Sequence, residues 1–208
     1  AHDYFQRLQF KNLLGRFDVE STVNKIENEF KEITGKEKIE AVFEEAMEAE
    51  RVGVALSADA GNVPPLFAHA SGFGRIALCY GEKKIYTIPC DMDMDMEELF
   101  QRLTLLADTV PVFVMFDLKK YLSYIRVMKQ EHAFDATVAA YLLNPLKNDY
   151  DYEDVAREQL NLMIDDKADE KTKNCYEAYT AYEAYGILND NLKQSGMDKL
   201  FWEIEMPL

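Results

Sequence analysis

The sequence predicts an α/β fold, a mixed β-sheet of about five strands flanked by helices. Apolar, β-branched runs of strand length occur in the middle of the chain, first at 52–57. From about residue 96 onward, apolar residues recur at helical spacing instead. Strands first, then alternating strands and helices, then helices alone are typical of an α/β or α+β domain with a mixed sheet.

The first 50 residues are expected to be helical. Residues 5–15 form a short apolar-periodic segment that ends at a glycine, as helices often do. Between 21 and 50 the chain is charged, and its apolar residues fall on two helical faces. These faces are Val23, Ile26, Phe30 and Ile33, and then Ile39, Val42, Phe43 and Ala46. Gly35 stands where the first helix would end, so we expect two helices, or a mobile arm, leading into the core.

The other strands and helices are predicted from the spacing of the apolar residues, which differs between strand and helix segments. Further strands are expected at 72–78, 84–88 and 111–116, and the turns at 59–65 and 80–82 favour antiparallel connections. Helices are expected at 96–106, 118–128, 135–143, 152–162, 170–193 and 198–206.

Composition narrows the class of function. The chain has 208 residues, 48% of them hydrophobic, and a net charge of −15. Such an acidic balance argues against autonomous binding to nucleic acid, which depends on clustered Lys and Arg. No apolar run approaches the ~20 residues of a membrane span. Three scattered cysteines do not make a disulfide framework, which favours reduced thiols and a cytoplasmic protein. We also expect no contact with a membrane, and a monomer.

One stretch carries a resemblance to a known family. It runs from Ala133-Phe134-Asp135-Ala136-Thr137-Val138-Ala139-Ala140-Tyr141-Leu142-Leu143-Asn144-Pro145 through Asp149-Tyr150-Asp151-Tyr152-Glu153-Asp154-Val155-Ala156. It resembles the 3′–5′ exonuclease domain of bacterial DNA polymerase I (family A). Phe201-Trp202-Glu203-Ile204-Glu205-Met206-Pro207-Leu208 is similar to the family's lead into its polymerase domain.

The resemblance implies a ribonuclease H-like 3′–5′ exonuclease fold and three regions. Residues 1–50 would be a helical linker or arm following a 5′ nuclease region. Residues 51–193 would be the exonuclease-like domain, and 194–208 the lead-in to a polymerase domain. The polymerase and 5′ nuclease domains of the same parent chain would be the partners, and contact with DNA would come through that parent, a DNA-directed DNA polymerase.

Exonucleases of this family need carboxylates, since two divalent metals hydrolyse the phosphodiester and such hard cations take oxygen ligands. The resemblance puts the first two ligand positions at Leu56 and Ala58 and the third at Tyr121. The fourth falls at Glu177, although a different gap would pair Tyr176 with Thr180. At most one of four carboxylates is kept, so we expect no metal, no catalytic residue and no cofactor in this chain. Mg²⁺ is expected only for the polymerase domain.

The motif around Phe134, Asp135 and Tyr141 is expected to be structural. Asp135 precedes an apolar-periodic segment, where an aspartate commonly caps a helix N-terminus. The buried face of that helix would then be Val138, Tyr141 and Leu142, at helical spacing.

These observations predict a catalytically inactive exonuclease-like domain that serves as a structural platform for DNA synthesis and repair by the parent polymerase. One alternative is an active metal-dependent exonuclease in which Asp59 or Asp117 replaces a lost ligand. Another is a protein-interaction module that uses the 21–50 arm, which would leave an apolar face of the arm exposed.

Overall fold

A six-stranded mixed sheet forms the centre of the computed structural model, which describes residues 25–58, 73–90, 95–122, 124–127, 129–147 and 149–207. The strand order is β1-β4-β3-β2-β5-β6. The strands are β1 (Phe30–Glu32), β2 (Arg51–Ala58), β3 (Phe73–Cys79), β4 (Ile85–Pro89), β5 (Val112–Met115) and β6 (Ala133–Asp135). Strand β3 runs antiparallel to β2 and β4, and the other pairs are parallel. The predicted α/β class is confirmed, with short edge strands β1 and β6 completing the sheet.

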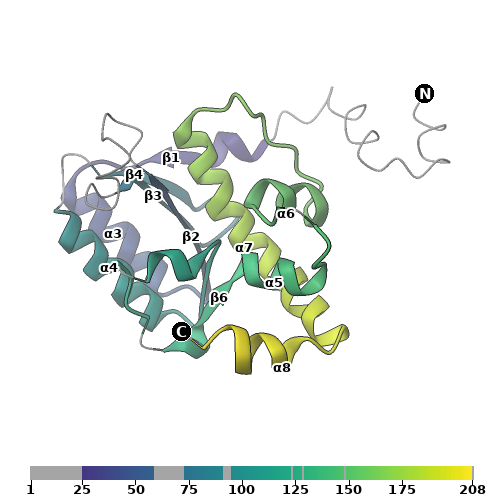
Figure 1. The fold of residues 1–208 in the computed structure, drawn as a ribbon. Helices are drawn as coiled ribbons and strands as arrows, with labels where there is room; N and C mark the ends of the chain where they lie inside the picture. The colour runs from purple at the N-terminus through teal and green to yellow at the C-terminus, as the bar shows by residue number, and fades with distance from the viewer. Residues whose placement is uncertain are drawn as a thin grey trace, which may run out of the picture.

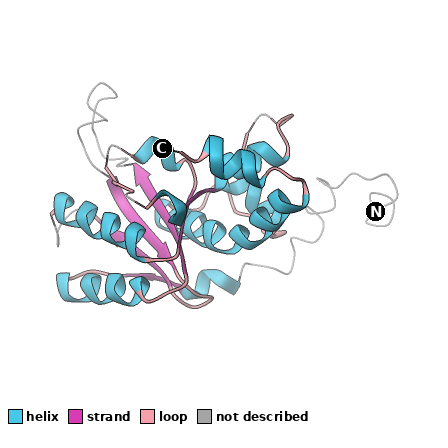
Figure 2. Cartoon of the chain, turned by 90° about the horizontal axis from the view of Figure 1, so that it is seen from below, coloured by secondary structure: helices cyan, strands magenta, loops and turns pink. Residues whose placement is uncertain are grey.

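Helices cover both faces of this sheet (Figures 1 and 2). Helices α3 (Lys36–Met47) and α4 (Met96–Thr109) lie side by side on one face. The long helix α7 (Glu170–Gln194) crosses the other face and contacts β2 and β3. Against α7 pack α5 (Ala136–Leu143) and α6 (Tyr152–Gln159), and the chain continues through α8 (Asp198–Leu200) and the π-helical turn η4 (Phe201–Glu205).

The apolar periodicity of α3 and α4 gives the packing that the sequence predicts. Ile39, Val42, Phe43 and Ala46 of α3 are all buried, and so are Leu99, Leu103 and Leu106 of α4. Each helix therefore presents one apolar stripe to the sheet and leaves its charged residues outside. Among the described residues, no helix is both long and apolar enough to cross a membrane.

The helix expected before Gly35 is not formed where the structure describes the chain. A 3₁₀ helix, η1 (Lys25–Glu29), is followed by β1, which pairs with β4. The amide of Ile33 then donates to the Thr87 carbonyl at 2.9 Å. Backbone pairing with the sheet edge thus replaces helical hydrogen bonds. Gly35, with φ of 91°, precedes the first turn of α3 and does not end a helix. The helix expected at 5–15 lies outside the described residues.

The helix expected at 118–128 is also wrong. One 3₁₀ turn, η2 (Leu118–Tyr121), is followed by irregular chain, a second 3₁₀ turn, η3 (Gln130–His132), and β6. The amides of Arg126 and Lys129 donate to the side chains of Thr104 and Asp108 on α4. These tertiary acceptors satisfy backbone donors that a helix would have satisfied internally.

Candidate functional site

The face of β2 that meets α7 is made of small residues. A Cβ atom added at Gly53 would lie 2.6 Å from the amide nitrogen of Tyr182 and closer still to the carbonyl oxygen of Ala178. Helix α7 therefore rests directly on the strand backbone. Ala55 belongs to the same apolar cluster as Ala178. Because side chains alternate along a strand, Ser57 is the next residue on this face.

The same alternation places Leu56 with Val52 and Val54 on the opposite face, where α3 and α4 pack. The Leu56 side chain is buried and turned away from the helix that carries Glu177. For Leu56, the ligand position inferred from the resemblance is therefore on the wrong face to meet Glu177. The backbone of Ala58 pairs with Phe73 across a register shift at the end of β2, and its side chain lies outside the described atoms.

Tyr121 lies against the C-terminal end of β2. Its hydroxyl donates to the Leu56 carbonyl at 3.4 Å, and its ring packs edge-on against Phe73, with 5.5 Å between centroids. Burial raises the pKa of Tyr121 to about 12, with further contributions from the charges of Glu177 and Asp117. At neutral pH the side chain is thus a neutral phenol that fills space and donates a hydrogen bond.

Glu177 lies on α7, near Asp117, Lys120 and Tyr121. Its pKa is raised to about 8, mainly by burial and also by the charge of Asp117, while Lys120 opposes the shift. Within the part of the chain that the structure describes, no hydrogen bond or ion pair to the Glu177 carboxylate is formed.

The raised pKa of Glu177 makes stability depend on pH. Between the ordinary value of 4.5 and about 8, the folded state keeps a proton that the unfolded state has lost, so the free energy of unfolding falls as pH rises through this window. We expect Glu177→Gln to remove that decline and to stabilise the fold by about 1–2 kcal/mol at pH 8.5, since one pKa unit is worth about 1.4 kcal/mol and partial hydration reduces the full value.

Urea unfolding at pH 5 and pH 8.5 measures this difference. Asp190→Asn, which changes an exposed carboxylate near the other end of α7, is the matched control and should keep the wild-type decline. An identical decline in Glu177→Gln and wild type would contradict the assignment of the slope to Glu177.

Two aspartates lie beside this region, and the Asp135 side chain caps a helix. Asp117 adopts a left-handed conformation (φ 50°) between β5 and η2, and its amide donates to the Thr137 hydroxyl at 3.0 Å. Asp135 is buried and accepts from the amides of Thr137 and Val138 at 3.0 and 3.2 Å. Its predicted N-cap geometry is therefore present. Burial raises the pKa of Asp135, while the backbone hydrogen bonds oppose this.

The other two residues of the structural motif behave differently from each other. Phe134 is fully buried between α7 and the C-terminal turns, with its ring 4.9 Å from Tyr185 and 4.8 Å from Phe201. Tyr141 is 48% exposed and touches Tyr150 instead of the core. Ala136 and Ala139 are the fully buried residues of α5, and Val138 and Leu142 are partly buried against the core, so the predicted buried face is wrong for Tyr141. The small side chains let α5 approach α7 closely, and this rotates Tyr141 outward.

The donors assembled here do not fit a pair of divalent cations. Across the described ranges, no three His, Cys, Asp or Glu side chains form a group that could hold a metal ion. Mg²⁺ keeps its hydration shell unless several oxygens replace it in octahedral geometry. Glu177 and Asp117 offer one carboxylate each, Asp135 is engaged with two backbone amides, and together these described carboxylates form no such set.

Sequence reasoning missed Gly53, which lies inside a predicted strand. A glycine within a strand often marks close approach of another backbone, and that signal was present. It could not show which helix approaches.

A pocket of about 590 Å³ lies away from these residues, at the start of β2. Arg51 forms part of its wall and stacks on the ring of Tyr182, with the guanidinium carbon 4.2 Å from the ring centroid. No predicted site residue lines this pocket.

Comparison with solved structures identifies proteins of similar fold. The chain matches the POL domain of Pol1 from M. smegmatis in complex with DNA primer-template and dNTP, at 17% identity and a TM-score of 0.64, over 85% of this chain and 30% of that one. It matches the Aedes aegypti Nibbler EXO domain at 11% identity and a TM-score of 0.60, over 85% and 94%. Brucella melitensis NrnC bound to pGG follows at 12% identity and 0.55, over 84% and 85%.

These matches show a 3′–5′ exonuclease-like, ribonuclease H-like fold. The chain spans less than a third of the polymerase chain that it resembles. No family model matches the sequence, and no curated protein matches it.

Proposed function

We propose that this chain is a catalytically inactive 3′–5′ exonuclease-like domain, and that it serves as a structural platform within a family A DNA polymerase. The single observation that carries the proposal is the contact between α7 and β2. Gly53, Ala55 and Ser57 face α7, the helix that carries Glu177, and none of them has a carboxylate. Leu56, the ligand position inferred from the resemblance, lies on the other face of β2. Without a carboxylate on this face, two-metal hydrolysis has no ligand set.

The platform role rests on packing and charge. A net charge of −15 disfavours independent binding of DNA, so contact with DNA would come through the parent chain. The partners in this proposal are the polymerase and 5′ nuclease domains of that parent, in the cytoplasm, with Mg²⁺ used by the polymerase domain. The M. smegmatis match, which covers a polymerase chain in part, supports this context.

The alternative of an active nuclease has one observation in its favour. The charge of Asp117 raises the pKa of both Glu177 and Asp135, so each of these two carboxyl groups lies within electrostatic range of Asp117. Asp135, however, is engaged with two backbone amides. Calorimetric titration with Mn²⁺ separates the two proposals: we expect no binding at millimolar metal, and saturable binding that Asp117→Asn abolishes would favour the nuclease.

The interaction-module alternative requires an exposed apolar face between residues 21 and 50. The apolar stripe of α3 is buried against the sheet, and Phe30 packs on Tyr176. Over the described residues 25–50, the feature that would support this alternative is therefore missing.

A direct assay tests catalytic silence. Purified chain, incubated with a 5′-labelled single-stranded DNA and either Mg²⁺ or Mn²⁺, should leave the DNA intact because no metal site forms. Metal-dependent shortening from the 3′ end that is lost in Asp117→Asn or Glu177→Gln would overturn the proposal. Asp108→Asn, on α4 and away from the site, is the matched control for each variant. Asp59, the other aspartate of the active-nuclease alternative, lies outside the described residues, so Asp59→Asn is tested as well. Shortening that survives every one of these changes would indicate a contaminating nuclease.

A further inference from the structure

The segment 25–33, which comprises η1, β1 and Ile33, lies between the sheet edge and the first turns of α7. On the sheet side, β1 pairs with β4 from Phe30–Ile85 to Glu32–Thr87. The amide of Ile33 adds a further hydrogen bond to the Thr87 carbonyl. One side of the segment is thus fixed to the sheet by backbone hydrogen bonds.

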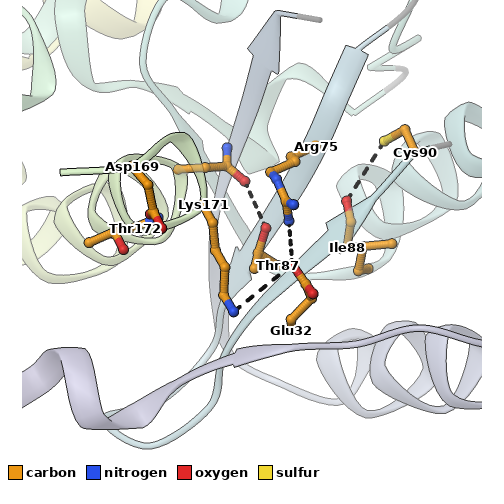
Figure 3. A network of polar contacts seen from close by, with 9 residues as sticks. Glu32, Arg75, Thr87, Ile88, Cys90, Asp169, Lys171 and Thr172 are labelled. Carbon is orange, nitrogen blue, oxygen red and sulfur yellow. Dashed lines mark hydrogen bonds and ion pairs between the residues drawn. The ribbon is translucent and has the colours of Figure 1, made fainter. Parts of the chain in front are cut away.

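On the other side, the same segment contacts α7 through three side chains. The Tyr176 hydroxyl donates to the Glu27 carboxylate. The Phe30 ring packs edge-on against that of Tyr176, with 5.0 Å between centroids. Glu32 lies between Arg75 of β3 and Lys171 of α7 (Figure 3). Its carboxylate oxygen is 2.7 Å from an Arg75 guanidinium nitrogen and 4.0 Å from the Lys171 Nζ. These contacts join the segment, the sheet and the helix.

A buried polar contact lies beneath this bridge. The Thr87 hydroxyl donates to the Asn174 side-chain oxygen at 3.2 Å, and both residues are almost wholly buried. Asn174 and Tyr176 belong to the turn of α7 that also carries Glu177. Tyr176 faces the segment, whereas Glu177 faces Asp117, Lys120 and Tyr121. The position of this turn therefore depends on residues 25–33 from one side and defines the candidate site on the other.

We propose that residues 25–33 act as a strap which holds the first turns of α7 against the sheet, and that release of the strap opens the site around Glu177. Whatever precedes the strap in the chain would then be coupled mechanically to that site. The proposal does not depend on nuclease activity, since it concerns the position of a helix.

The test compares the double variant Glu27→Ala/Glu32→Ala with wild type by hydrogen exchange. Loss of the Tyr176 hydrogen bond and of the Glu32 bridge should raise exchange of the amides at 174–178 roughly fivefold, because these contacts close the local opening. Exchange at 186–192, near the other end of α7, should stay at the wild-type rate. The titration midpoint of Glu177, followed by NMR, should fall from about 8 toward its ordinary value as water enters.

Glu40→Ala is the matched control, because Glu40 pairs with Arg102 at 3.2 Å and its side chain is about as exposed as that of Glu32. It removes an ion pair between α3 and α4 and should leave exchange at 174–178 unchanged. Equal acceleration along all of α7, no acceleration, or faster exchange with an unmoved Glu177 midpoint would each overturn the strap.

Discussion

Truncation of Phe134 to alanine is expected to lower the free energy of unfolding by about 3–5 kcal/mol, the usual cost of removing a buried aromatic ring. Phe134 is fully buried, and its ring lies among those of Tyr185, Phe201 and Trp202. It therefore joins the edge strand β6 to α7 and to η4. Phe134→Ala would leave a cavity lined by these three rings. The rings belong to helical segments that are packed in the core, so the surrounding structure can relax only partly into the cavity.

Urea unfolding measures this cost as a shift of the midpoint at an unchanged slope. Tyr141→Ala is the control, because it removes an aromatic ring from the same short motif but from a half-exposed position. We expect it to cost about 1 kcal/mol or less. Similar losses in the two variants would show that burial at Phe134 does not determine the stability of this region.

Gly53→Ala is expected to destabilise the fold by about 3 kcal/mol, at the upper end of the range for overpacking. The added methyl group would meet the Ala178 carbonyl oxygen and the Tyr182 amide nitrogen, which are backbone atoms in the middle of a 25-residue helix. No side-chain rotation can relieve that contact, so α7 must move away from the sheet. A carboxylate at this position would require a still larger displacement.

Gly186→Ala, on α7 itself, is the control for backbone freedom. Its added Cβ would have the Arg51 guanidinium at 3.9 Å as its nearest neighbour, which is ordinary contact. Since alanine favours a helix by up to about 1 kcal/mol over glycine, this variant should be neutral or more stable. Thermal or urea unfolding that finds Gly53→Ala equally harmless would remove the close helix–strand approach on which the proposed loss of a metal site rests.

Both substitutions test how far side-chain and backbone packing holds the fold together. The contacts of Phe134 and Gly53 join α7, β2 and the C-terminal turns through packing. Burial of apolar groups stabilises the fold once no charged ligands must be kept apart. Stability of the domain should therefore be insensitive to chelators, in contrast to proteins whose folding depends on a bound metal.

The sequence by itself determined the elements whose pattern is strong and local. The apolar stripes of α3 and α4 and the apolar run of β2 predict their burial, and the position of Asp135 predicts the cap of α5. In each case the physical cause lies within a few residues, as a repeat that matches one period or as a side chain that reaches the nearest amides.

Tertiary structure decided the rest. Residues 25–33 have helical spacing but pair with β4, and Arg126 and Lys129 give their amides to α4 side chains, because distant partners satisfied these backbone groups better than local ones. The outward turn of Tyr141, the direction of Leu56 and the seating of α7 on Gly53 depend on which face meets which neighbour. The period of a sequence shows that an element has two faces. Which face contacts which neighbouring element is decided only when the elements pack together.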